Sequence, residues 1–248
     1  MIATLRTWAF NAAFFGGSVP IVLLAPVMAM VGPAALRWWV VFWTRFHRFC
    51  ARWVLGIRVV VSGTIPTTPA LYAGKHQAMF ETFEMVALLD APVIVLKKEL
   101  SEIPVWGWAA KRYGMIVVDR DGSSSALRQM MRDAEAAAAS GRSVVIFPEG
   151  TRVTPGETPE LKPGFVGLYR ALKMPLVPVA IDSGTAWPKH GAKRPGVPIR
   201  FAFQPAIPPG LHRREVDPLV YAAINALERP FPPAPPPPPP PSHRPKPA

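Results

Sequence analysis

The chain has 248 residues, of which half are hydrophobic and 18% are charged, and its formal net charge is +12. A chain of this length forms one large domain, or a medium-sized domain with attached segments. Its single cysteine, Cys50, excludes an intrachain disulfide bond and fits a reducing compartment. So much apolar sequence beside the positive charge, with no recognised nucleic-acid-binding motif, argues against a protein that binds nucleic acid.

Residues 1–80 contain arginines and one lysine but no aspartate or glutamate, a composition that suits an anionic membrane surface. Residues 7–36 carry no charge, and the run AFNAAFFGGSVPIVLLAPVMAM within them is long enough to enter a bilayer, which about 20 apolar residues span. We therefore expect a membrane segment here, and a cleaved signal peptide is the simplest alternative. Five residues interrupt the run and predict that it does not form one straight helix: Gly16, Gly17, Pro20, Pro26 and Pro33.

The next segment, residues 36–58, predicts a helix with two unlike faces. At about 100° per residue, the arginines fall on one side of this helix: Arg37, Arg45, Arg48 and Arg52. Bulky aromatic residues fall on the opposite side: Trp39, Phe42, Trp43, Phe46, Phe49 and Trp53. Such a helix is typical of a membrane interface, and the alternative is an amphipathic helix packed on a protein core. Because arginine flanks the apolar run on both sides, we predict that residues 1–56 form a membrane-associated helical hairpin with both ends on the cytoplasmic side.

Beyond residue 58, short β-rich runs alternate with helical runs, which predicts an α/β domain over residues 57–229 with a partly parallel sheet flanked by helices. The predicted strands are residues 57–63, 70–74, 93–98, 115–120, 143–150, 176–181 and 199–203. The predicted helices are residues 79–89, 124–140, 164–173 and 217–228. Residues 230–248 are rich in proline and predict a disordered polyproline tail.

The segment LYAGKHQAMFETFEM places His76 between a predicted strand and a predicted helix, where α/β domains carry their functional sites. On one continuous helix His76 and Glu81 would point about 140° apart, so they meet only if His76 lies in the turn before the helix. Glu84, one turn beyond Glu81, is the alternative partner. An imidazole held by a carboxylate at one nitrogen can accept a proton at the other, so His76 is a candidate general base. The alternative is a structural histidine.

A second polar turn follows the predicted strand in SVVIFPEGTR and presents Glu149, Thr151 and Arg152. Gly150 allows a tight turn at this point. The planar guanidinium of an arginine suits two phosphate oxygens at once. The sequence therefore indicates an anion-binding turn at a strand end, and a surface loop with unrelated charges is the alternative.

Four segments, in their order and spacing, resemble the blocks of the glycerolipid acyltransferases: KHQAMFE, YGMIVVDRDG, FPEGTR with LKPGF, and LVPVAI. The run KKELSEIPVWGWAAKRYG also resembles the stretch between the first and second blocks of that family, and the resemblance covers residues 59–204. It implies transfer of an acyl chain from acyl-CoA or an acyl carrier protein thioester to the free hydroxyl of lysophosphatidic acid, giving phosphatidic acid. It also implies a location at a bacterial-type inner membrane, in contact with membrane lipids, with the catalytic domain on the cytoplasmic side.

The resemblance assigns roles to individual residues. The family's first block is His, four residues, Asp, so His76 matches the base and Glu81 stands where an aspartate orients that base. The extra methylene of Glu81 leaves open whether Glu81 or Glu84 is the partner. The family's acceptor site matches Glu149, Gly150 and Thr151. Its phosphate-binding positions match Arg120 and Arg152, of which Arg152 is the first choice, and Lys162 and Lys97 or Lys98 are weaker phosphate-binding candidates.

Direct transfer without an acyl-enzyme is expected, because the chain lacks a G-x-S-x-G elbow and Cys50 lies in the predicted membrane helix. The remaining histidines are scattered and no Walker A or G-x-G-x-x-G loop is present, so we predict neither a metal nor a cofactor. Two alternatives remain. One is an acyltransferase for another lyso-lipid, such as a lyso-ornithine lipid, and the other is a non-catalytic membrane adaptor that displays its proline-rich tail to a partner.

Overall fold

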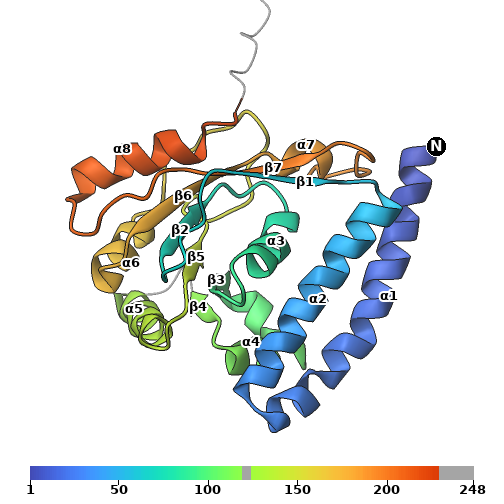
Figure 1. Cartoon of the computed structure of the whole chain (residues 1–248), viewed down its shortest axis with the longest axis horizontal. Coiled ribbons are helices and arrows are strands. Elements are labelled where there is room, and N and C mark those ends of the chain that lie inside the picture. The colour runs from blue at the N-terminus through green and yellow to red at the C-terminus, as the bar shows by residue number, and fades with distance from the viewer. Residues whose placement is uncertain (119–123, 229–248) are drawn as a thin grey trace, which may run out of the picture.

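The computed structural model describes residues 1–118 and 124–228, which contain a seven-stranded sheet with helices on both faces (Figure 1). The strands are β1 (Val59–Ser62), β2 (Leu71–Gly74), β3 (Val93–Lys97), β4 (Ile116–Val118), β5 (Val144–Ile146), β6 (Leu176–Ile181) and β7 (Ile199–Phe203). Their order is β1-β7-β6-β2-β5-β3-β4; β7 runs antiparallel to β6 and parallel to β1, and the other pairs are parallel. The predicted α/β class with a partly parallel sheet is confirmed, and each predicted strand has its counterpart.

The helices around the sheet are α3 (Phe80–Leu88), α4 (Trp106–Tyr113), α5 (Ser124–Ala139), α6 (Gly164–Leu172), α7 (Ser183–Ala186) and α8 (Arg213–Ile224), with a 3₁₀ helix, η1 (Lys98–Glu102). The predicted helices correspond to α3, α5, α6 and α8. Helix α8 begins before the predicted residue 217, because a capping box between His212 and Glu215 sets its start. Helix α4 was not predicted; it is short and follows Val105, whose φ of 60° is unusual for a branched residue.

The central strands are buried along their whole length, as expected for strands covered on both faces. Tyr72, Val145 and Val177 pack into a core shared with the N-terminal helices and α3. Their chain neighbours Leu71, Val144 and Leu176 face the opposite side and pack with α5, α6 and α8. Two cores therefore hold β5, β2 and β6 rigidly, and the loops at the ends of these strands start from fixed points.

Helices α1 (Ile2–Val31) and α2 (Pro33–Val54) form an antiparallel hairpin along one side of the domain (Figure 1). By length and composition α1 could cross a membrane. Gly16, Gly17, Pro20 and Pro26 do not end α1, which continues through them to Val31, and only Pro33 lies beyond it. A Cβ atom on Gly17 would lie 2.6 Å from Cζ of Phe46, so this glycine makes room for α2 rather than breaking α1. Residues 230–248, the predicted tail, lie outside the described residues.

The aromatic residues of α2 do not form the single face that the sequence predicts. The indole Nε1 of Trp39 donates to the carbonyl of Ile21, and that of Trp43 donates to Oγ of Ser18, both at 2.8 Å. These two side chains therefore bind α1. Phe42, Phe49 and Trp53 are exposed instead. A helical wheel distinguishes two sides, whereas α2 has three surroundings: α1, the α/β domain and the surface.

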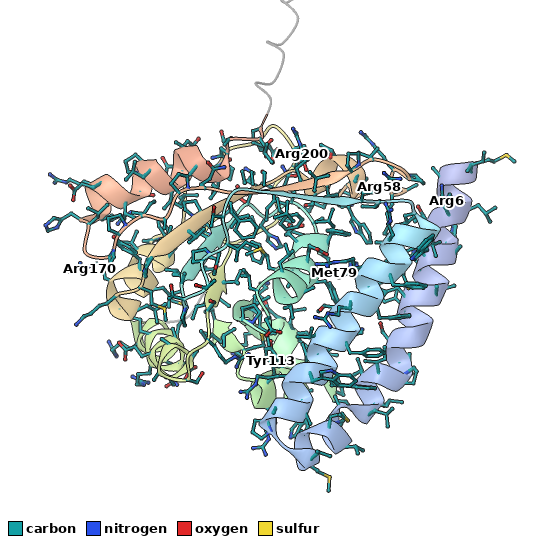
Figure 2. The ribbon with its side chains drawn as sticks, viewed as in Figure 1. Arg6, Arg58, Met79, Tyr113, Arg170 and Arg200 are labelled. Carbon is teal, nitrogen blue, oxygen red and sulfur yellow. The ribbon has the colours of Figure 1, made fainter. Side chains whose placement is uncertain are left out.

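The arginines of α2 also divide. Arg48 forms a two-point ion pair with the buried Glu84 of α3, with Nε 3.1 Å from Oε2, whereas Arg45 and Arg52 are exposed. Arg48 is thus used to hold α2 against the domain. Arg6 of α1 holds the end of α2 from the other side, since its Nε donates to the carbonyl of Val54 at 2.6 Å. Figure 2 shows Arg6 on α1 close to where the chain leaves α2 for β1.

Candidate active site

Three neighbouring parallel strands bring the candidate residues together. β2 pairs with β5, where Ala73 lies opposite Ile146, and with β6, where Gly74 lies opposite Val179. The carboxyl ends of the three strands therefore reach the same edge of the sheet. Three segments far apart in the sequence meet there: the turn at residue 76 after β2, the turn at residue 149 after β5, and the start of α7 after β6.

His76 and Glu81 are in contact, with His76 Nδ1 2.8 Å from Glu81 Oε1. His76 lies in the turn before α3 and Glu81 in its first turn, which is the arrangement that allows the two side chains to meet. Glu84, the alternative partner, bonds Arg48 instead. The contact partner of His76 in the structure is therefore Glu81.

The Glu81 carboxylate is fully buried and held from several directions. Oε1 also accepts the backbone N–H groups of Gln77 and Ala78 at 2.6 Å, and Oε2 accepts the hydroxyl of Ser183 at 2.6 Å. Its place in the first turn of α3 suits a negative charge. The extra methylene is thus taken up within the turn. Ser183 was missed in the sequence, because it lies 102 residues further along the chain and belongs to no recognised motif.

The His76 imidazole stacks on the ring of Phe147, with the ring centroids 4.3 Å apart. Its side chain is 16% exposed, so one edge of the ring reaches the surface. With Nδ1 donating to Glu81, Nε2 is the nitrogen that can accept a proton. Among the described side chains, those of residues 1–118 and 128–228, none forms a hydrogen bond with Nε2. The geometry therefore orients His76 as a candidate base, with Nε2 as the nitrogen that can accept a proton.

Glu149, which the family resemblance assigns to the acceptor site, has its side chain turned into the protein interior. Its side chain is fully buried, Oε2 accepts the backbone N–H of His76 at 2.9 Å, and Oε1 lies 2.7 Å from Nζ of Lys75. Burial raises the pKa of the Glu149 carboxyl, and Lys75 opposes that rise. Lys75 was not singled out in the sequence, because a lysine beside a histidine reads as an exposed charge.

The turn after Glu149 places the predicted phosphate ligands at the surface. Gly150 has a φ of 72°, a conformation that favours glycine. Thr151 and Arg152 follow it and are exposed. Lys162 joins this turn: its backbone N–H donates to the carbonyl of Pro148 at 2.8 Å, and its side chain is exposed. Arg152 and Lys162 are therefore carried by the same structural unit as the Glu149 turn.

Of the remaining phosphate candidates, Lys97 and Lys98 lie further from the His76 turn in the strand order. Arg120 lies outside the described residues. Lys97 ends β3, which β5 separates from β2, and its Nζ lies 2.5 Å from Oε1 of Glu99. Lys98 begins η1. Neither lysine follows a strand that adjoins β2.

A cavity of about 430 Å³ lies away from the His76 turn, between α2, α3 and β1. Its charged lining consists of Arg48, Arg52, Arg58 and Glu84. Within residues 1–118 and 124–228, no group of three His, Cys, Asp or Glu side chains could hold a metal ion. The polar groups that this part of the chain gathers at the strand ends are the His76–Glu81 pair and the exposed Arg152.

Two relatives illustrate the sequence similarity. The chain is 34% identical over 217 residues to a 1-acyl-sn-glycerol-3-phosphate acyltransferase of Pseudomonas aeruginosa, an alignment that covers 86% of this chain and 81% of that protein. It is 25% identical over 190 residues to the enzyme of the same name from Saccharomyces cerevisiae, covering 74% of this chain and 62% of that protein.

The fold is also shared with a solved structure, the crystal structure of the 1-acyl-sn-glycerophosphate (LPA) acyltransferase from Thermotoga maritima. The TM-score is 0.70 at 18% sequence identity, over 90% of this chain and 95% of that one. The model of the family described as Acyltransferase matches residues 56–182, which include β2 with the His76 turn, β5 with the Glu149 turn, and β6. With this match and the 34% identity to the Pseudomonas enzyme, the chain belongs to the acyltransferase family.

Proposed function

We propose that this enzyme transfers an acyl chain from an acyl thioester to the free hydroxyl of lysophosphatidic acid, giving phosphatidic acid for phospholipid biosynthesis. The observation that carries the proposal is the 2.8 Å contact between His76 Nδ1 and the buried Glu81 carboxylate, which leaves Nε2 as the proton acceptor. The names of the relatives support lysophosphatidic acid as the acceptor. Acyl transfer to a hydroxyl needs such a base, because a neutral hydroxyl is a weak nucleophile.

The reaction follows from the placement of this base. The acceptor hydroxyl donates its proton to Nε2 of His76 while its oxygen attacks the thioester carbonyl carbon. The tetrahedral intermediate collapses, the carbon–sulfur bond breaks, and the thiolate takes the proton back from the imidazole. Glu81 stabilises the imidazolium that exists between the two proton transfers, and its hydrogen bonds prevent the ring from turning. No acyl group is bonded to the protein at any step.

The acceptor phosphate is proposed to bind at the surface turn formed by residues 150–152 and Lys162. Arg152 can bind two phosphate oxygens with its guanidinium, and Lys162 adds a second positive charge on the same turn. Arg120 is the third candidate, on the basis of the family resemblance alone. Gly150 and Thr151 shape the turn that presents Arg152.

The N-terminal hairpin is proposed to hold the enzyme at the membrane from which the acceptor comes, with the α/β domain on the cytoplasmic side. Its support is the exposed apolar surface of α1, formed by Ile2, Leu5, Trp8, Phe15, Val19, Leu23, Leu24, Val27, Met30 and Val31. Exposed aromatic side chains of α2 extend this surface: Trp38, Phe42, Phe49 and Trp53. A contiguous apolar surface of this kind indicates contact with lipid or another protein, and the arginines beside it favour anionic lipid.

Purified enzyme in detergent micelles tests the proposal when it is offered two acceptors, lysophosphatidic acid and lyso-ornithine lipid, each with acyl-CoA and with an acyl carrier protein thioester. We expect phosphatidic acid from the first acceptor, identified by mass spectrometry. Comparing the rates with the two donors then shows which thioester the enzyme uses. Acylation of lyso-ornithine lipid alone would overturn the proposed acceptor. Lack of transfer to either acceptor from either donor would contradict the proposed reaction.

A further inference from the structure

Lys75, the residue before His76, is fully buried, and oxygen atoms surround its ammonium group. Nζ lies 2.7 Å from Oε1 of Glu149 and 2.7 Å from the backbone oxygen of Glu157. It also donates to Oδ1 of Asn225 at 2.7 Å, and Oε1 of Glu228 lies 3.6 Å away. A buried ammonium is costly unless it is paired and hydrogen-bonded, so an enclosure this complete reflects a structural requirement at this point of the chain.

Glu149 connects this enclosed charge to the peptide unit that carries His76. One of its oxygens faces Lys75, and the other accepts the backbone N–H of His76 at 2.9 Å. Because Lys75 and His76 are adjacent, the ion pair and the hydrogen bond fix the same peptide unit from both sides. The position of the imidazole relative to a bound substrate therefore depends on these two contacts as well as on Glu81.

Glu228 closes the arrangement from the far end of the described chain. Its Oε1 accepts a hydrogen bond from Nε2 of Gln77, and its Oε2 accepts the backbone N–H of Gly156 at 2.6 Å. Gln77 in turn accepts the backbone N–H of Gly184 at 2.9 Å. Through these bonds, Glu228 ties the turn after β2 to the loop after β5 and to α7.

We propose that Lys75, Glu149 and Glu228 are positioning residues for acyl transfer: a buried ion network that holds the His76 turn in register with Glu81 and touches neither substrate. The proposal rests on His76 being the base of the proposed function. It differs from the family resemblance at Glu149, which would act through the backbone of His76 rather than on the acceptor. The network then controls the rate of transfer and not the affinity for the acceptor.

Lys75 and Glu149 are further expected to act as a pair. Lys75→Met leaves the Glu149 carboxylate buried without its counter-charge, whereas Glu149→Gln turns an amide NH₂ toward the Lys75 ammonium. The double variant has neither the unpaired buried carboxylate nor the contact between two donor groups. Its glutamine oxygen can still accept the N–H of His76, and its NH₂ group faces a neutral thioether. The loss of kcat in the double variant should therefore be smaller than the product of the losses in the two single variants.

The experiment measures kcat and the acceptor KM for lysophosphatidic acid in neutral detergent micelles. The proteins are the wild type, Lys75→Met, Glu149→Gln, the double variant and Glu228→Ala, with Glu160→Gln as the control, since Glu160 is an exposed glutamate of the loop between β5 and α6. We expect each single network variant to lower kcat by about 10- to 100-fold with an acceptor KM within about twofold of wild type. The kcat of the double variant should lie about fivefold or more above the value expected if the two single losses multiplied, and Glu160→Gln should match wild type.

A rise in acceptor KM with kcat retained in Glu149→Gln would overturn the proposal, because that result means direct contact with the acceptor. Losses that simply multiply in the double variant would also overturn it. Should the Lys75 or Glu149 variants fail to fold, Glu228→Ala decides, since Glu228 lies at the edge of the network and is 11% exposed: an unchanged kcat contradicts the proposal. A wild-type enzyme inactive on lysophosphatidic acid refutes the proposed acceptor instead, and the same cycle is then measured with the lyso-lipid that is acylated.

Discussion

At the scale of single residues, one carboxylate organises the candidate site. Glu81 binds His76 Nδ1, two backbone N–H groups of the same turn and the hydroxyl of Ser183. It thus fixes both the tautomer of the imidazole and the conformation of the turn that carries it. This chain has a glutamate where the family's first block has an aspartate, and the turn accommodates the additional methylene.

Glu81→Gln should lower kcat by about 100-fold or more, because the neutral amide no longer stabilises the imidazolium that general-base catalysis forms. Glu81→Asp should retain part of the activity, since the charge is kept and only the reach is shortened. Glu84→Gln is the matched control: Glu84 bonds Arg48 and not His76, so turnover by this variant should stay close to wild type. A silent Glu81→Gln with a damaging Glu84→Gln would mean that the functional partner of His76 is the other glutamate.

Arg152→Ala should raise the KM for lysophosphatidic acid by about 10- to 100-fold, which corresponds to one charge-assisted contact of about 1.5–3 kcal/mol, and should change the KM for the acyl donor less. Arg170→Ala is the control, because Arg170 is an exposed arginine of α6 (Figure 2). Steady-state kinetics with each substrate varied in turn makes the distinction. A donor KM that rises while the acceptor KM stays constant would place the arginine on the thioester side.

At the scale of secondary-structure elements, an ion pair joins α2 to α3 beside their aromatic contacts, such as that between His47 and Phe83. Glu84 is buried in α3, and Arg48 of α2 reaches it with a side chain that is 39% exposed. Burial raises the pKa of the Glu84 carboxyl, while the hydrogen bond and the charge of Arg48 oppose that rise. The hairpin is therefore fastened to the domain through a carboxylate that becomes costly once its partner is lost.

Arg48→Met should lower the free energy of unfolding at neutral pH by about 1–3 kcal/mol, because Glu84 is left buried and unpaired. A carboxyl with a raised pKa in the folded protein favours folding below its unfolded pKa and loses that contribution as the pH rises. The melting temperatures of variant and wild type should therefore be similar near about pH 4 and diverge toward about pH 8. Arg52→Met, at an exposed arginine one turn later, should show no such divergence. A deficit independent of pH would contradict this account.

The sequence predicts those elements whose pattern is local. The strand runs and α3, α5, α6 and α8 follow from hydrophobic periodicity, and the turns at residues 76 and 149 from their places at predicted strand ends. The partition of the α2 aromatics could not be predicted, because it depends on how α1 packs. The choice of Glu81 over Glu84 required the turn geometry. Lys75 with Glu228 and Glu81 with Ser183 are contacts over 153 and 102 residues, and periodicity carries no information about such pairs.

At the scale of the whole molecule, an apolar hairpin and a basic α/β domain share one chain. The exposed apolar face of α1 and the exposed aromatics of α2 lie beside Arg45 and Arg52. We expect the full-length protein to require detergent for release from membranes, because burial of apolar surface is not screened by salt. Sedimentation after washing with high salt and with detergent measures this. Quantitative release by salt alone would show that the hairpin is a soluble cap on the domain.

The central claim is that His76 is the general base, and transfer by purified His76→Ala in neutral detergent micelles tests it most directly. We predict that the rate of acyl transfer to lysophosphatidic acid falls by about 100-fold or more, while the melting temperature and membrane attachment match those of the wild type. The imidazole is partly exposed and stacked on Phe147, so its removal should leave the fold intact. Turnover close to that of the wild type in a folded His76→Ala protein would contradict the account.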